Sequence, residues 1–200
     1  MYYIDLSFYR TGGHSDVFEV YPSVKNIGWL DIDGEFEKGA LSLELIQKLK
    51  ELIFLDVKNQ DDIKNGVFEE EKAVIVDQML TRGSPHQCSF CNSEAISLSP
   101  GEVEIYSGDR AKALGLNEIC IPSANGKVVY SCPTLICHYI EKHGYLPPEE
   151  FVEALKAFDL HKAYNSNENE AFDCCVDVPA PDIDSLTTEN VMSYPESEDC

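Results

Sequence analysis

The chain has 200 residues, of which 44% are hydrophobic and 10% aromatic, so it can bury a substantial core without disulfides. Its 36 acidic and 15 basic residues give a formal net charge of −21, which repels phosphate backbones and disfavours direct nucleic-acid binding. The sequence has no apolar stretch of the roughly 18 residues that a membrane span needs and no signal-peptide pattern at its start, so we expect a cytoplasmic protein that does not enter a membrane.

The N-terminal part of the chain predicts strands followed by a helix. Apolar residues at 3–8 and 17–21 form two β-prone runs around the turn residues 11–13. Ser42 is a favourable N-cap, and apolar residues recur at helical spacing over 43–53, which predicts a helix of about three turns.

The middle of the chain is less regular. Residues 56–72 are polar and charged, and we expect a long loop there, whereas 73–76 fit either a strand or the start of a short helix. Asn125-Gly126 is a strong turn signal that predicts a hairpin between the last two of three short strands. These strands are expected at 102–106, 118–121 and 127–130.

Two helices are expected near the C-terminus. Pro133 opens the first, which Gly144 ends, and Pro148 lies near the start of the second, whose apolar residues recur over 151–158. The fold class is therefore α+β, with a small, mostly antiparallel sheet and about three main helices.

The last 36 residues differ in composition from the rest. Residues 165–200 contain ten acidic residues and no Lys or Arg. We expect one folded domain over 1–164 and an acidic tail over 165–200 that is mobile or loosely docked.

Cys88-Ser89-Phe90-Cys91 is the most specific chemical motif, because two thiolates three positions apart on a tight turn can reach one tetrahedral Zn²⁺. It supplies only half of a site. Partners must come from other Cys and His residues, namely His86, Cys120, Cys132, Cys137, His138 and His143.

The preferred ligand set is Cys88, Cys91, His138 and His143, which would hold a structural Zn²⁺ and staple a ββα-like unit. Forty-six residues separate Cys91 from His138, so tertiary structure must join the two halves. Positions five apart on an ideal helix point ~140° apart, so the histidines converge only if the last turn before Gly144 loosens.

Other interpretations of these residues stay open. An all-cysteine set would use Cys88, Cys91, Cys132 and Cys137. Alternatively the buried thiols are small hydrophobes, the CxxC is an ordinary turn, and the histidines bond to backbone carbonyls. The remaining thiols, expected to be free, are Cys174, Cys175 and Cys200.

Four segments together resemble a family of uncharacterised bacterial proteins: GWL at 28–30, HQCSFC at 86–91, NEICIPSANGKVVY at 117–130 and LICHYIEKHGYLPPEEFVEAL at 135–155. The resemblance places His86, Cys88, Cys91, His138 and His143 in shared motifs and implies one common site, without an activity. Residues 56–76, Cys120, Cys132, Cys137 and the tail depart from the pattern.

The sequence contains no nucleophile elbow, phosphate-binding glycine loop or HExxH helix, so no catalytic residue is proposed. The first functional hypothesis is a non-enzymatic interaction protein, of immunity or regulatory type, whose acidic surface covers a basic protein partner. The alternative is a metal- or cysteine-dependent enzyme of unknown substrate.

Overall fold

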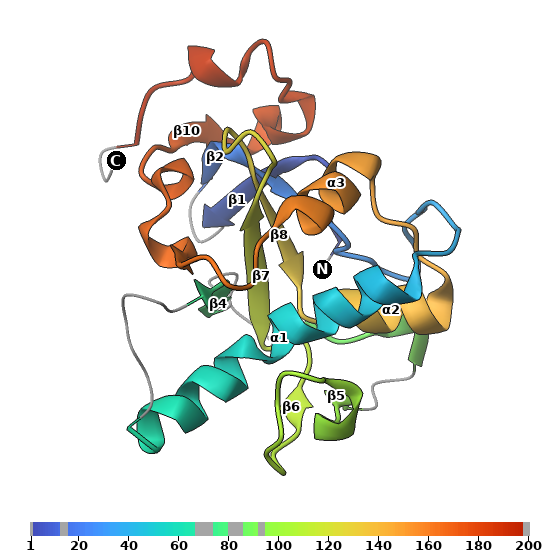
Figure 1. The fold of residues 1–200 in the computed structure, drawn as a ribbon. Helices are drawn as coiled ribbons and strands as arrows, with labels where there is room; N and C mark the ends of the chain where they lie inside the picture. The colour runs from blue at the N-terminus through green and yellow to red at the C-terminus, as the bar shows by residue number, and fades with distance from the viewer. Residues whose placement is uncertain (1, 13–15, 67–73, 80–85, 92–94, 198–200) are drawn as a thin grey trace.

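The computed structural model describes residues 2–12, 16–66, 74–79, 86–91 and 95–197 (Figure 1). Along the chain, its strands and α-helices are β1 (Phe8–Gly12), β2 (Val17–Asn26), α1 (Leu43–Lys64), β3 (Val74–Ile75), β4 (Asp77–Met79), β5 (Ser97–Leu98), β6 (Lys112–Ala113), β7 (Asn117–Pro122), β8 (Val129–Pro133), α2 (Ile136–His143), α3 (Glu149–Ala157), β9 (Tyr164–Asn165) and β10 (Val176–Pro179).

The main sheet has the strand order β1-β2-β8-β7-β4, and β10 also pairs with β2. All of these pairings are antiparallel except β2 with β8. Two small sheets, β3 with β9 and β5 with β6, lie apart from it. The predicted α+β class and mostly antiparallel sheet are confirmed, and no helix in the described ranges is long and apolar enough to cross a membrane.

The hairpin of β7 and β8 forms at the predicted Asn-Gly turn. Gly126 has a φ of 72°, which the left-handed turn requires. The Asn125 side chain accepts a hydrogen bond from the Lys127 backbone N–H at 3.0 Å, and the Ser123 N–H donates to the Val128 carbonyl at 2.7 Å. Local residues therefore fix the register of the central strands.

Helix α1 is 22 residues long and crosses the sheet (Figure 1). The helix is longer than the predicted three turns and continues to Lys64, so the loop predicted at 56–72 is wrong over 56–64. Residues 67–72 lie outside the described ranges. Polar side chains of this extra length bind the segment that follows β5: Lys112 donates to Asp56 at 3.1 Å, and Arg110 donates to Asp61 at 2.9 Å. The polarity of this segment therefore marks a contact between segments of the chain, although it is also the composition expected of a long loop.

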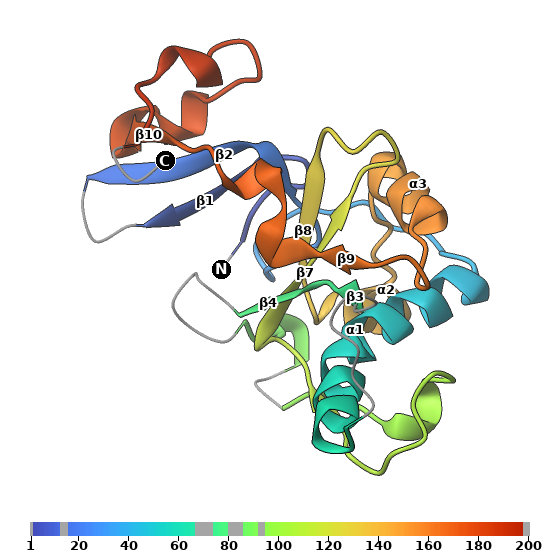
Figure 2. The same ribbon diagram turned by 60° about the vertical axis from the view of Figure 1, so that its left-hand side comes forward.

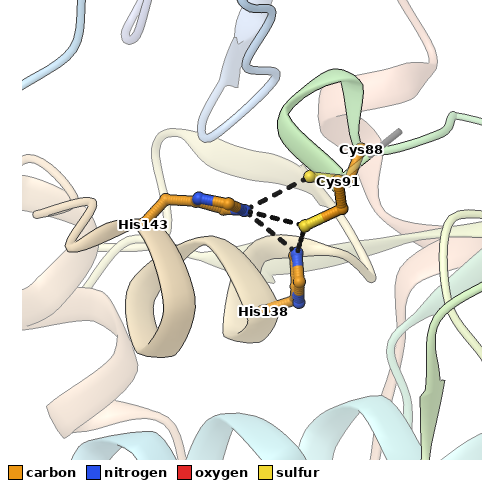
Figure 3. Close-up of side chains that lie close together, drawn as sticks. All are labelled: Cys88, Cys91, His138 and His143. Atoms are coloured by element: carbon orange, nitrogen blue, oxygen red, sulfur yellow. Dashed lines mark hydrogen bonds between the residues drawn. The ribbon is translucent and has the colours of Figure 1, made fainter. Parts of the chain in front are cut away.

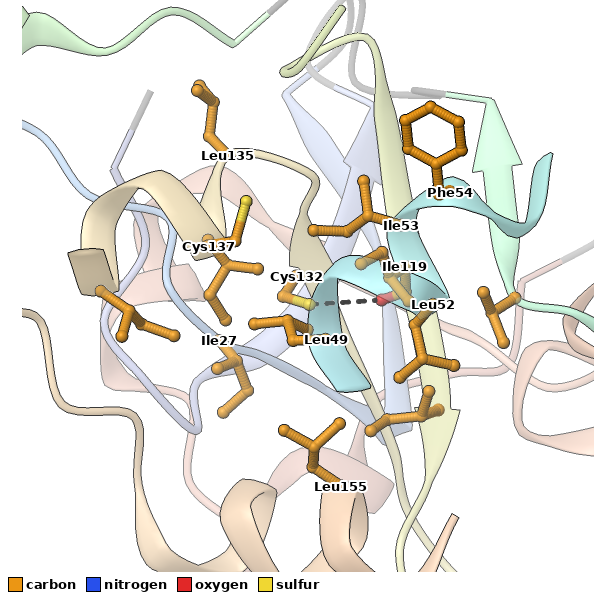
Figure 4. Packing of buried hydrophobic residues seen from close by; sticks show 14 of the residues in the cluster. Ile27, Leu49, Leu52, Ile53, Phe54, Ile119, Cys132, Leu135, Cys137 and Leu155 are labelled. Atoms are coloured by element: carbon orange, nitrogen blue, oxygen red, sulfur yellow. Dashed lines mark hydrogen bonds between the residues drawn. The ribbon is translucent and has the colours of Figure 1, made fainter. Parts of the chain in front are cut away.

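The core lies between α1, α2, α3 and the hairpin (Figure 4). Helix α1 packs against β7, β8 and the two later helices. The buried side chains there include Leu49, Leu52, Ile53 and Phe54 of α1, Ile119 of β7, Cys132 of β8, Leu135 just before α2, Cys137 of α2 and Leu155 of α3. Residues 74–75 are a strand, which decides between the two alternatives for 73–76; Ala73 itself lies outside the described ranges.

The expected strand at 102–106 is absent from this described segment, which forms a 3₁₀ turn at Pro100–Glu102 and then irregular backbone. The Ser99 backbone N–H donates to the Glu102 carboxylate at 2.9 Å, so the side chain expected on a strand caps the turn instead.

The C-terminal segment contacts the sheet beside β2. Strand β10 pairs with β2, and the Val176, Val178 and Val191 side chains bury Val20 in a separate apolar cluster. Figure 2 shows this part of the chain at the β1–β2 end of the molecule, away from the second half of α1. The domain boundary at 164 stays a prediction.

Candidate metal centre

The CxxC segment forms a 3₁₀ turn, Ser89–Cys91. The Cys91 N–H donates to the Cys88 carbonyl at 3.3 Å, which closes the turn. The Ser89 hydroxyl accepts a hydrogen bond from the Ile32 N–H at 2.9 Å. The turn is thus tied to a distant loop, and both thiols point toward α2 (Figure 3).

Both candidate histidines lie on α2, five positions apart. Gly144 adopts a φ of 67°, and its N–H donates to the Tyr139 carbonyl. The Tyr145 N–H donates to the same carbonyl at 3.1 Å. These bonds span five and six residues where a regular α-helix spans four, so the helix ends in a wide turn. The loosened last turn that the spacing required is present.

The four side chains converge on one point. His143 Nε2 lies 3.4 Å from each thiol sulfur, of Cys88 and of Cys91. His138 Nε2 lies 3.4 Å from Cys91 Sγ and 3.1 Å from His143 Nε2. All four ligand atoms lie within 4.8 Å of one another, so this group could hold a metal ion.

The two imidazoles are in the form that binds a cation, whereas the Cys88 thiol must lose its proton to bind one. Burial raises the pKa of the Cys88 thiol to about 11, and the neighbouring Cys91 adds to this shift. Burial also lowers the pKa values of His138 and His143, which keeps both imidazoles neutral near pH 7. A cation would offset the cost of ionising the buried Cys88 thiol, and neutral imidazoles are the form that binds metal.

An aromatic side chain covers one side of the cluster. The Phe90 ring, between the two cysteines, lies 4.8 Å from the His143 ring and packs edge-on against Phe36. Our sequence reasoning missed Phe90, although its position inside the CxxC was a signal. A hollow of about 690 Å³ borders Phe90 and His143 on the outer side.

Helix α2 is also braced from behind. Lys50 of α1 is 8% exposed and donates to Glu141 at 2.9 Å and to Glu102 at 3.2 Å. This pair of contacts fixes the α2 turn between the two histidines relative to α1.

The other candidate ligands lie elsewhere. His86 is buried against Trp29, with ring centroids 5.1 Å apart, and its Nε2 lies 3.0 Å from the Tyr139 hydroxyl. Cys132 and Cys137 donate weakly to backbone carbonyls in the core, and Cys120 packs in a separate apolar cluster. Burial raises the pKa of Cys137 to about 12. The all-cysteine set is therefore not brought together within the described ranges.

A family model described as a domain of unknown function, DUF7919, matches residues 1–156. The chain belongs to this family. The DUF7919 match contains all four clustered residues and ends within α3, before the acidic tail. The expected membership of an uncharacterised family is confirmed, whereas the individual segment motifs and the bacterial source stay predictions. No curated protein and no solved structure matches the chain.

Proposed function

We propose that this domain binds one structural Zn²⁺ through Cys88, Cys91, His138 and His143. The observation that supports the proposal is the convergence of the four ligand atoms. A tetrahedral zinc ion with ordinary bond lengths separates sulfur from nitrogen by about 3.6 Å and nitrogen from nitrogen by about 3.3 Å. Three of the four sulfur–nitrogen distances here are 3.4 Å and the nitrogen–nitrogen distance is 3.1 Å, so these four pairs of atoms are already close to tetrahedral spacing.

The donor set favours zinc among common ions. Two thiolates and two imidazoles are poor ligands for Mg²⁺ and Ca²⁺, which take oxygen ligands, whereas tetrahedral S₂N₂ sites are typical of zinc. The cysteines lie on a 3₁₀ turn outside the hairpin, so the ion would join this turn to α2. It would not staple a compact ββα finger. With four protein ligands the site has no position for water, and this makes the ion structural.

Within this stabilised fold, we propose a non-enzymatic role in binding a basic protein. The support is the net charge of −21 and the lack of catalytic sequence motifs. In a pull-down with elution by increasing salt, we expect basic proteins to be retained at low salt and released at high salt. Captured proteins that leave equally at low and high salt would count against this role.

Cobalt substitution tests the metal proposal, because Co²⁺ gives intense visible bands in tetrahedral sites and weak bands in octahedral ones. We expect wild type to show a strong tetrahedral spectrum that Cys88→Ser and His138→Ala lose. Cys174→Ser and His161→Ala change exposed residues away from the cluster and are expected to keep it. A weak octahedral spectrum in wild type, or an unchanged one in His138→Ala, contradicts the proposed ligand set.

A second candidate is a metal-dependent enzyme, which the hollow beside His143 and Phe90 favours. In that case three protein ligands hold the ion and water occupies the fourth position. Adding azide to the cobalt protein distinguishes the two. An open site binds the anion and its spectrum shifts, whereas the closed structural site keeps its spectrum.

A further inference from the structure

A second cavity, which none of the four clustered residues lines, borders the N-terminal segment. It has a volume of about 600 Å³, within the usual range for small-molecule sites. Its walls are formed by residues 2–8, by β1 and β2, and by residues 183–188 of the C-terminal segment. It therefore exists because that segment folds back beside β2.

Two cationic side chains line this cavity, in a chain whose net charge is −21. The Arg10 guanidinium lies 5.3 Å from the Tyr3 ring centroid and 5.2 Å from that of Phe18. Lys25 Nζ lies 3.1 Å from the Phe8 ring centroid. Aromatic rings thus hold both cations in place, and within the described ranges neither forms an ion pair with a carboxylate.

Partial burial of the Lys25 ammonium group is costly. Burial lowers the pKa of Lys25 to about 8, the direction expected for an ammonium group that loses water without gaining an anion. Two carboxylates also border the cavity. The Asp5 carboxylate accepts hydrogen bonds from the Gly28 N–H at 2.8 Å and from the Tyr145 hydroxyl at 2.9 Å. The Asp184 carboxylate is exposed to solvent.

The backbone beside the cations is strained. Leu6, which lines the cavity, has a φ of 63°, a conformation that leucine rarely adopts. Buried Asn26 holds the turn in place: its side-chain amide donates to the Ser7 hydroxyl at 3.1 Å and to the Phe8 carbonyl at 2.8 Å. The wall of the cavity is thus fixed by its surroundings before any ligand binds.

We propose that this cavity binds a small molecule that carries an anionic group on an apolar or aromatic body. Arg10 and Lys25 would bind the anionic group, a phosphate or a carboxylate. The partly exposed apolar side chains of Ile183 and Leu186 would contact the body of the ligand. This proposal is independent of the zinc ion and of the basic partner.

Calorimetric titration of the full chain with three probes tests the proposal. Naphthyl phosphate has both the anion and the aromatic body, naphthol lacks the anion, and inorganic phosphate lacks the body. We expect naphthyl phosphate to bind at least about tenfold more tightly than either of the others. No measurable binding of naphthyl phosphate, or naphthol binding equally well, overturns the proposal.

Variants then locate the binding. A hydrogen bond to a charged group contributes about 1.5–3 kcal/mol, so Arg10→Gln and Lys25→Met are each expected to weaken binding at least about tenfold. Lys127→Met removes the same charge from an exposed turn and should change affinity less than about twofold. Circular dichroism verifies that each variant folds. If one of the two cavity variants fails to fold, the remaining one still tests the proposal. Naphthyl phosphate that binds a folded cavity variant as tightly as wild type contradicts the site.

Discussion

Removing the C-terminal segment tests how the acidic tail relates to the folded domain. A chain that ends at Tyr164 loses β10 and the valines that bury Val20. It also loses Phe172, whose ring packs edge-on against Tyr9 with centroids 5.9 Å apart. Val20 and Tyr9 are at most 2% exposed in the full chain, so truncation uncovers both. We expect the shortened chain to fold, because the main core and the metal cluster lie within residues 1–164.

Burying one large apolar side chain contributes about 1.5–3 kcal/mol, and the denatured chain is already partly collapsed, so we expect a loss of about 3 kcal/mol. For a chain of this size that loss lowers the melting temperature by about 6–12 °C. Differential scanning calorimetry of both chains measures it. Val178→Ala in the full chain should produce part of the effect, and Met192→Ala, at an exposed tail residue, should produce none. A shortened chain that melts within about 2 °C of the full one refutes the reasoning.

Three further predictions concern the metal ion, the hairpin turn and the reactivity of the thiols. Chelation is expected to lower the melting temperature by about 5–11 °C, the effect of removing an ion present at about 100 times its dissociation constant, and Cys88→Ser should no longer respond to chelator. Gly126→Ala should cost about 1–2 kcal/mol in urea unfolding because of its left-handed backbone, whereas Gly101→Ala, at an open position without that backbone, should be neutral. In thiol labelling of the native protein, exposed Cys174 should react first, and buried Cys137, whose pKa burial raises to about 12, should react only on unfolding.

Local chemistry predicted the parts of the fold that local residues control. Asn125-Gly126 predicted the hairpin, and Gly144 and Pro148 predicted where the two later helices end and begin. The four residues of the candidate cluster could also be selected from the sequence, because a CxxC turn and two histidines on one short helix are the residue types that hold zinc. Only the tertiary structure shows that these two halves meet.

The parts that sequence reasoning missed depend on distant partners. The polar end of α1 is helical because Asp56 and Asp61 bind residues about 50 positions later in the chain. Similarly, β10 forms because β2 has an open side that a short valine-containing segment can pair with. Arg10 and Lys25 also gave no signal of a common cavity, since only the pairing of β1 with β2 brings them together.

The proposed zinc ion on Cys88, Cys91, His138 and His143 can be detected directly. Metal content by mass spectrometry, on protein purified without a metal-affinity tag, tests it most directly. We predict about one zinc per chain in wild type and in His161→Ala, and almost none in Cys88→Ser and His138→Ala. Wild-type protein without zinc, or a full equivalent retained by both ligand variants, would contradict the account.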